Sequence, residues 1–207
     1  MPKSRPRIPL SRQRIFEAAL TIADRDGEQA VTMRGVAREL GVEAMSLYHH
    51  VSDRDDLLDG LAETMVRSGL PAPPQGIPAR TILTEFARGI RATAHAHPDA
   101  FHLVGLRPLR SPEAGNAITK LLLALGSAGM TPDLAVNSYR VIAAFTRGFA
   151  LSEIAGLTFG PDVNTSLPPA LKPYTAALRR NNHEMFEAGL AAVINGLVAE
   201  IPGKRRR

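Results

Sequence analysis

One stretch of twelve residues, LGVEAMSLYHHV from Leu40 to Val51, limits what this chain can fold into more than any other. It has the pattern of a short helix that is entered across Gly41 and carries a tyrosine followed by two histidines. Because helix nucleation is costly, so short a helix is marginal when only its own hydrogen bonds hold it. Neighbouring segments must therefore brace it, through Leu47 and Val51, and its outer face must serve a purpose outside the core.

The segments on either side of this stretch have the pattern of amphipathic helices. Ser11–Gly27 and Thr32–Gly41 each begin with an N-cap residue and end with a glycine. The next helix is expected to begin at Ser52 or Asp53, and its acidic first turn suits the positive end of a helix dipole. Its inward-facing apolar positions are Leu57, Leu58, Leu61 and Met65.

The helical pattern stops at LPAPPQGIP, Leu70–Pro78, where four prolines and a glycine in nine residues predict a stiff connector over residues 70–79. Strand alternation is absent throughout. We therefore predict an all-α fold with one unit in residues 11–69 and a larger helical unit in residues 80–203. Helices of the larger unit are expected near Ala79–His97, Pro98–Leu106, Pro112–Gly129, Pro132–Leu157, Pro169–Asn182 and His183–Ile201.

Composition and charge narrow the class of function. The chain has no cysteine, which excludes disulfides and thiolate metal sites and fits the cytoplasm. Its net charge is +5, and basic residues crowd into an arm at residues 1–10 and a tail at residues 204–207. A basic arm beside a folded unit is typical of nucleic-acid binding, although it can also be a solvated tail. Within and just after this arm, Arg5, Arg7 and Arg12 are expected to contact phosphates or the minor groove.

Several classes of protein are excluded by what the sequence lacks. No apolar run is long enough to span a bilayer, so we expect no membrane association. There is no GxSxG sequence, no phosphate-binding glycine loop and no HExxH sequence. We therefore predict that the protein is not an enzyme and needs no cofactor.

Three consecutive helices, with the last two joined by a turn at Gly41, match a helix-turn-helix over residues 32–51. In that motif the second helix of the pair lies in the major groove of DNA. Its exposed face is expected to hold Ala44, Met45, Tyr48 and His49. Tyrosine and histidine side chains can bond to phosphates, and a methionine can contact a thymine methyl group.

The segment VTMRGVARELGVEAMSLYHHVSDRDDLLDGLAETM resembles the DNA-binding domain of the TetR family of bacterial transcriptional repressors, over about Ser11–Gly69. The resemblance implies that Thr32 caps a helix near a phosphate and that Arg34 reaches a base. At Ala44 the sequence departs from the tetracycline repressor, which reads a base there with an amide side chain. Tyr48 and His50 have an alternative role, which is to pack beneath the following helix. The residues expected to contact phosphate are Ser46, Tyr48, His50 and Arg54.

The resemblance also implies that the larger domain binds a small effector and forms a homodimer. The last helix supports a dimer by its own pattern, because Gly189, Ala192 and Gly196 form a smooth strip where a second helix could approach closely. The alternative is a helix buried wholly within its own subunit. Its apolar stripe consists of Phe186, Leu190, Val193, Ile194, Leu197 and Ile201.

Polar residues on otherwise apolar helices are candidates to line an effector pocket. These candidates are His102, Asn137, Tyr139, Thr146 and Ser152. No metal is expected, because His95 and His97 point about 200° apart on a helix. In alignment with the tetracycline repressor, Leu103 and Ser152 stand where that protein uses a histidine and an acidic residue.

Together these patterns predict a cytoplasmic, homodimeric repressor that binds a palindromic double-stranded DNA operator. A small, mainly apolar molecule is expected to release it from DNA without a metal. The alternative is an architectural DNA-binding protein that has no effector. Residues 80–203 argue against that alternative, because DNA binding alone would not need a second helical domain.

Overall fold

The computed structural model describes residues 9–69, 73–74, 76–110, 112–156, 169–175 and 181–203. Every regular element within these ranges is a helix, which confirms the all-α prediction. Most of the predicted basic arm (residues 1–8), parts of the predicted connector (residues 70–72 and 75) and the basic tail (residues 204–207) lie outside the described residues. None of the described helices is long and apolar enough to cross a membrane.

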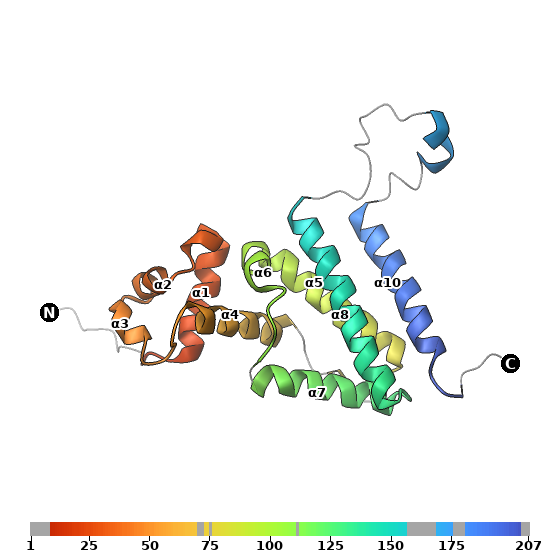
Figure 1. Ribbon diagram of the computed structural model, residues 1–207, viewed down its shortest axis with the longest axis horizontal. Coiled ribbons are helices and arrows are strands. Elements are labelled where there is room, and N and C mark those ends of the chain that lie inside the picture. The colour runs from red at the N-terminus through yellow and green to blue at the C-terminus, as the bar shows by residue number, and fades with distance from the viewer. Residues whose placement is uncertain are drawn as a thin grey trace.

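The N-terminal unit has its helices where the sequence predicts them (Figure 1). They are α1 (Arg12–Asp26), the 3-10 helix η1 (Glu28–Ala30), α2 (Met33–Leu40), α3 (Ala44–Leu47) and α4 (Arg54–Gly69). The hydroxyl of Ser11 accepts a hydrogen bond from the Arg14 N–H at 3.3 Å, and that of Thr32 accepts one from the Gly35 N–H at 3.0 Å. At α4 the cap is Asp53, whose carboxylate accepts from the Asp56 N–H at 2.9 Å.

The short helix α3 is braced as predicted. Gly41 ends α2 in the left-handed conformation, with φ of 65°, and lets the chain turn into α3. The α-helix covers only Ala44–Leu47, and turns continue it to Val51, whose N–H donates to the Leu47 carbonyl at 2.9 Å. Leu47 and Val51 are completely buried in one apolar cluster with Ile15, Ala19 and Val36. This packing holds in place a helix that its own hydrogen bonds could not maintain.

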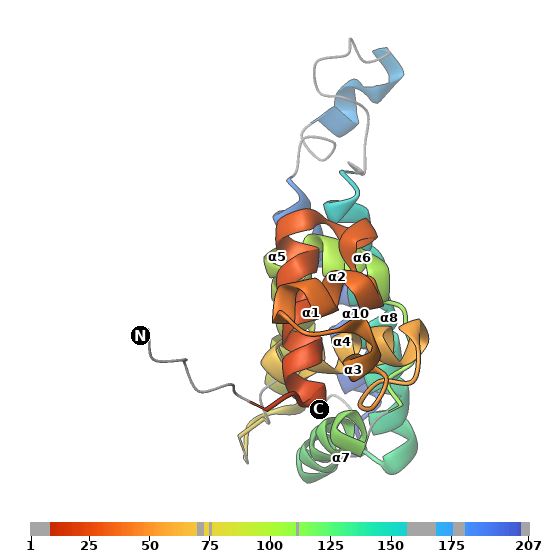
Figure 2. The same ribbon diagram turned by 90° about the vertical axis from the view of Figure 1, so that its left-hand side faces the viewer.

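The larger unit is a bundle in which α5 packs against α8 and α10 packs against both. Its elements are α5 (Ala79–Ala96), α6 (Pro98–Val104), α7 (Pro112–Ser127), α8 (Pro132–Ile154), η2 (Pro169–Tyr174) and α10 (Asn182–Ala199). The segment expected to be a helix from Pro169 to Asn182 contains the 3-10 helix η2, and Pro173 inside it has no N–H to donate to an α-helix. Figure 2 shows η2 apart from the rest of the bundle.

The two units share part of one core. Phe101 and Val104 of α6 are buried in the same apolar cluster as the residues of α1, α2 and α4. Hydrogen bonds reinforce this junction, because His97 Nδ1 lies 2.8 Å from the Asp24 carboxylate and His102 Nδ1 lies 2.8 Å from that of Glu28. A second cluster joins α5, α7, α8 and α10. The N-terminal unit is therefore anchored to the bundle mainly through α6 and α4.

Candidate DNA interface and effector cavity

The outer face of α3 exposes large side chains at the tip of the molecule. Met45 is 72% exposed and Tyr48 is 46% exposed, although both are large and partly apolar. His49 is also exposed, whereas Ala44, Ser46 and His50 are half-buried. Such exposure at the end of a rigid, braced helix suits a surface that contacts another molecule.

Three further residues predicted to contact DNA lie at the starts of the helices before and after α3, Thr32 and Arg34 at α2 and Arg54 at α4. Thr32, Arg34 and Arg54 are exposed, and neither arginine forms a hydrogen bond or ion pair with any described residue. The hydroxyl of Thr32 accepts the cap hydrogen bond, which leaves its own O–H free to donate to a phosphate. Two exposed guanidinium groups without a partner among the described residues are suited to a polyanion.

Arg12 has a different position from the one the sequence predicts. Its guanidinium donates to both carboxylate oxygens of Asp56, at 2.5 Å and 3.0 Å, and to the backbone carbonyl of His50. It also stacks over the Phe16 ring at 5.1 Å. The hydrogen bond from Arg12 holds the pKa of the Asp56 carboxyl below its usual value. Arg12 therefore fixes the end of the recognition segment instead of extending toward phosphate.

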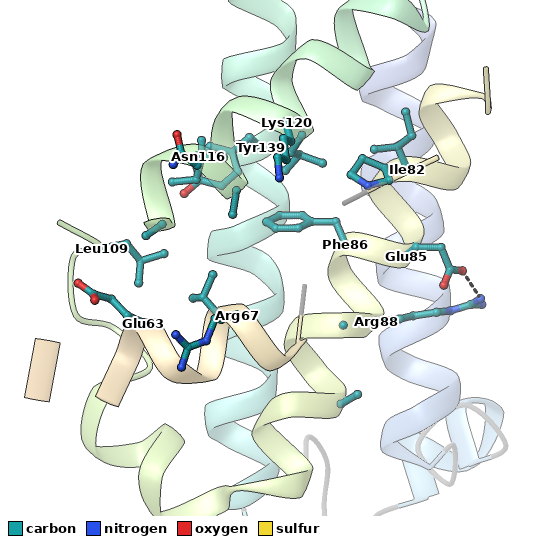
Figure 3. A pocket seen from close by; sticks show the side chains of 18 of the residues that line it. Glu63, Arg67, Ile82, Glu85, Phe86, Arg88, Leu109, Asn116, Lys120 and Tyr139 are labelled. Atoms are coloured by element: carbon teal, nitrogen blue, oxygen red, sulfur yellow. Dashed lines mark hydrogen bonds and ion pairs between the residues drawn. The ribbon is translucent and has the colours of Figure 1, made fainter. Parts of the chain in front are cut away.

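A cavity of about 670 Å³ lies between α4, α5, α7 and α8 (Figure 3). Its wall is largely apolar, and the rings of Phe86 and Tyr139 form a tilted pair with centroids 5.7 Å apart. Other apolar lining residues are Val66, Ile77, Ile82, Leu109, Ile118 and Leu121. A space of this size, with an apolar wall and a few polar groups, is typical of a small-molecule site.

Of the five residues predicted to line a pocket, only Tyr139 lines this cavity. Asn137 is exposed elsewhere on α8, and His102 pairs with Glu28 at the junction with η1. The Ser152 hydroxyl donates to the Gly148 carbonyl at 2.9 Å, and Thr146 is buried without a hydrogen-bond partner among the described residues. A polar residue on an apolar helix is easily recognised in a sequence, but the pattern does not show which neighbour it will face.

Glu153 lies near the end of α8, next to Ser152, the position where the tetracycline repressor has an acidic residue. Its carboxylate is almost fully buried and receives two hydrogen bonds from Arg91, both 2.7 Å long, and one contact of 3.1 Å from His95. Burial raises the pKa of Glu153, but the bonds from Arg91 and His95 outweigh it and leave the pKa below its usual value. Among the described residues no group of three potential ligands is placed to hold a metal ion.

A braced helix-turn-helix joined to a helical domain with a largely apolar pocket defines a class of protein: DNA-binding transcriptional regulators, which are not enzymes. Comparison with known families agrees, because residues 15–61 match the bacterial regulatory proteins of the tetR family and residues 70–201 match the tetracyclin repressor-like C-terminal domain. The chain belongs to the TetR family and is a ligand-responsive, DNA-binding repressor.

Relatives and solved structures cover nearly the whole chain. The transcriptional repressor DrrR1 of Streptomyces coeruleorubidus is 29% identical over 99% of this chain and 83% of its own length. The class A tetracycline repressor from transposon 1721 of Escherichia coli is 31% identical over 88% of each chain. The crystal structure of apo ActR from Streptomyces coelicolor superposes with a TM-score of 0.78 at 26% identity, covering 94% of this chain and 100% of ActR.

Proposed function

We propose that this repressor acts in the cytoplasm as a homodimer that binds a palindromic operator and leaves it when a mainly apolar molecule enters the cavity. The observation that carries the proposal is the path of α4. This helix begins at Arg54, a few residues after α3 ends, and its later residues Glu63, Val66 and Arg67 line the cavity. A ligand that favours one position of α4 would therefore shift the DNA-binding unit in proportion to its differential affinity.

The proposed DNA contacts divide by chemistry. Arg34 reads a base, by preference guanine, because its guanidinium can donate to two acceptors of that base at once. Met45 supplies an apolar contact to a thymine methyl group, and Ala44 and His49 lie on the same reading face. Phosphate contacts position the helix without reading sequence. The proposed phosphate-binding residues are Thr32, Ser46, Tyr48, His50 and Arg54.

The proposed dimer interface lies on α8 and α10, which run side by side at the end of the molecule opposite α2 and α3 (Figure 1). On α10 the side chains of Phe186, Leu190 and Ile194 are buried within the subunit, whereas Ala192 and Gly196 are exposed. An exposed strip of small residues allows a helix of a second subunit to approach closely. Such a dimer presents two α3 helices to half-sites about one turn of DNA, roughly 34–36 Å, or more apart.

The proposed effector is held without a metal ion. Glu153, the acidic residue adjacent to Ser152, is already engaged by Arg91 and His95. A serine hydroxyl is a poor substitute for a carboxylate ligand of magnesium. The structure of ActR in complex with actinorhodin aligns with this chain at 28% identity, and this precedent supports a small-molecule ligand for the present chain.

Measurements of DNA binding, of assembly and of ligand binding test the proposal. Footprinting on the DNA that flanks the gene should reveal a palindrome, and sedimentation should show two subunits on it. Calorimetry with tetracycline plus magnesium should show no heat. Micromolar binding that a chelator abolishes and that releases the operator would contradict a metal-free effector, whereas DNA binding that no cellular extract relieves would favour the architectural alternative.

A further inference from the structure

The charged side chains that line the cavity are not balanced. Arg88 forms an ion pair with Glu85 at 3.4 Å and a two-point pair with Glu187 at 2.9 and 3.1 Å. Figure 3 shows the Arg88 side chain directed outward along Glu85, away from the Phe86 ring. The remaining charged lining residues in the described part of the chain are Glu63, Arg67, Lys120 and Arg147.

Three of these four residues are cations that form no ion pair or hydrogen bond with a described residue: Arg67, Lys120 and Arg147. They project from three different helices, α4, α7 and α8. They therefore approach one space from several directions. Of the two acidic lining residues, Glu85 pairs with Arg88, which leaves Glu63 as the other lining carboxylate. Cations gathered around an apolar space repel one another, and an anion placed among them relieves that repulsion.

The aromatic residues in the cavity wall favour an anion with a flat ring system. Phe86 and Tyr139 offer two aromatic rings that can stack on or pack edge-to-face with a flat ligand. The Tyr139 hydroxyl makes no hydrogen bond with a described residue, and Asn116 adds an amide beside Lys120 on α7. An arginine guanidinium matches a carboxylate or sulfonate in geometry as well as charge.

We propose that the effector is an aromatic anion, a flat ring system that carries a carboxylate, sulfonate or ionised phenol. The rings lie against Phe86 and Tyr139, and the anionic group faces Arg67, Lys120 and Arg147. This inference rests on the proposed function, because it takes the cavity to be the effector site. It narrows the ligand from a mainly apolar molecule to one whose acidic group provides part of the affinity and selectivity.

A pair of fluorescent probes separates the two contributions. The anion 8-anilinonaphthalene-1-sulfonate and the neutral N-phenyl-1-naphthylamine share one ring skeleton and differ in the sulfonate. Titrated into the full-length protein at low salt, the anionic probe should bind about tenfold more tightly than the neutral one. The difference should shrink as salt is raised, because screening weakens exposed charge interactions.

Variants then locate the anionic group. Arg67→Gln, Lys120→Gln and Arg147→Gln should each weaken the anionic probe by about threefold, as expected for partly exposed ion pairs, and leave the neutral probe unchanged. Lys172→Gln is the matched control, because this exposed cation on η2 does not line the cavity. Equal affinities for the two probes, or equal losses with the control variant, would overturn the aromatic-anion inference alone.

A cavity-filling variant tests the underlying proposal separately. Ala117 lines the cavity, so Ala117→Phe should reduce the binding of both probes while the protein keeps its helical content. If both probes still bind this variant as they bind the wild type, the cavity is not the effector site. That result would overturn the proposed role of the cavity, whereas a loss of both probes supports it.

Discussion

Arg12 in the first turn of α1 holds Asp56 in the first turn of α4, with its terminal nitrogens 2.5 Å and 3.0 Å from the two carboxylate oxygens. The same guanidinium donates to the His50 carbonyl, and Asp56 also accepts the N–H of Ser52 at 2.9 Å. The contact therefore joins the helices before and after the helix-turn-helix at the point where the chain leaves α3. We therefore expect Arg12 to position the proposed DNA-reading face without touching DNA itself.

Replacing Arg12 with glutamine should lower operator affinity by about tenfold, because α3 loses a constraint on its orientation. The slope of log affinity against log salt distinguishes this role from a phosphate contact. Loss of a phosphate contact reduces that slope by about 0.9, whereas loss of a positioning contact leaves it unchanged. Fluorescence anisotropy over a series of salt concentrations measures both quantities.

The partner variant Asp56→Asn is the control, because it removes the same ion pair without changing any cation near the DNA. In a double-mutant cycle the two substitutions should be coupled by about 1 kcal/mol or less in stability, since the Arg12 side chain is half exposed. If Arg12→Gln gives a smaller slope of log affinity against log salt while Asp56→Asn binds the operator like wild type, Arg12 contacts phosphate instead of positioning α3.

Acid should destabilise the N-terminal unit through Asp56. Its folded pKa is lowered, first by the hydrogen bond from Arg12, so its contribution to stability is fully present above the unfolded value of about 3.9. That contribution is lost as the pH falls through the lower folded pKa. Below about pH 4, the melting temperature should therefore fall more steeply with falling pH for the wild type than for Asp56→Asn. Parallel curves would show that the pair contributes nothing to acid sensitivity.

Substitutions of Arg34 and of Tyr48 should distinguish base reading from phosphate binding. Arg34→Ala and Tyr48→Ala should each weaken specific binding by about 1–3 kcal/mol. Only Arg34→Ala should relax the sequence preference, because a phosphate contact carries no base information. Affinities for the operator and for a set of single-base variants provide the comparison. Wild-type footprints for both variants would show that α3 is not the reading helix.

Gly60 should resist substitution for a reason of packing. A Cβ at this position of α4 would lie 2.1 Å from ring atoms of Phe16, a residue that is only 6% exposed. Gly60→Ala should therefore destabilise the protein by about 1–3 kcal/mol, despite the usual gain from alanine in a helix. Gly115→Ala on α7 is the matched control, because nothing lies within 4 Å of its Cβ position.

For the control, urea titrations should show a small gain in stability of roughly 0.5–1 kcal/mol. If Gly60→Ala is stabilised to the same extent, the Phe16 ring moves aside more easily than its burial indicates.

The sequence predicts the DNA-binding unit far better than the cavity. The caps at Ser11 and Thr32 and the burial of Leu47 and Val51 follow from residues close together in the chain, where local patterns determine the structure. The Arg12–Asp56 pair spans 44 residues, and no periodicity indicates it. The cavity depends on which sides of α4, α5, α7 and α8 meet.

Phe86 illustrates the limit of such prediction. On its own it is one apolar residue among many on an amphipathic helix, and core packing is the expected role of such a residue. Its contact with Tyr139 and its place in the cavity wall come from the crossing of α5 and α8, which helix periodicity leaves open.

The apolar cluster that α6 shares with α1, α2 and α4 bears on how regulators of this architecture can be recombined. A chimera joined at the proline-rich connector would contain a DNA-binding unit whose apolar surface normally packs against Phe101 and Val104. The effector-binding domain of another protein would have to match that surface. Otherwise the interface would pack poorly, and ligand binding would no longer move the DNA-binding unit. A transplant that carries α6 with the DNA-binding unit keeps this cluster together, but it must also carry α5, so the demand for a matching surface moves to the face where α5 packs against α8.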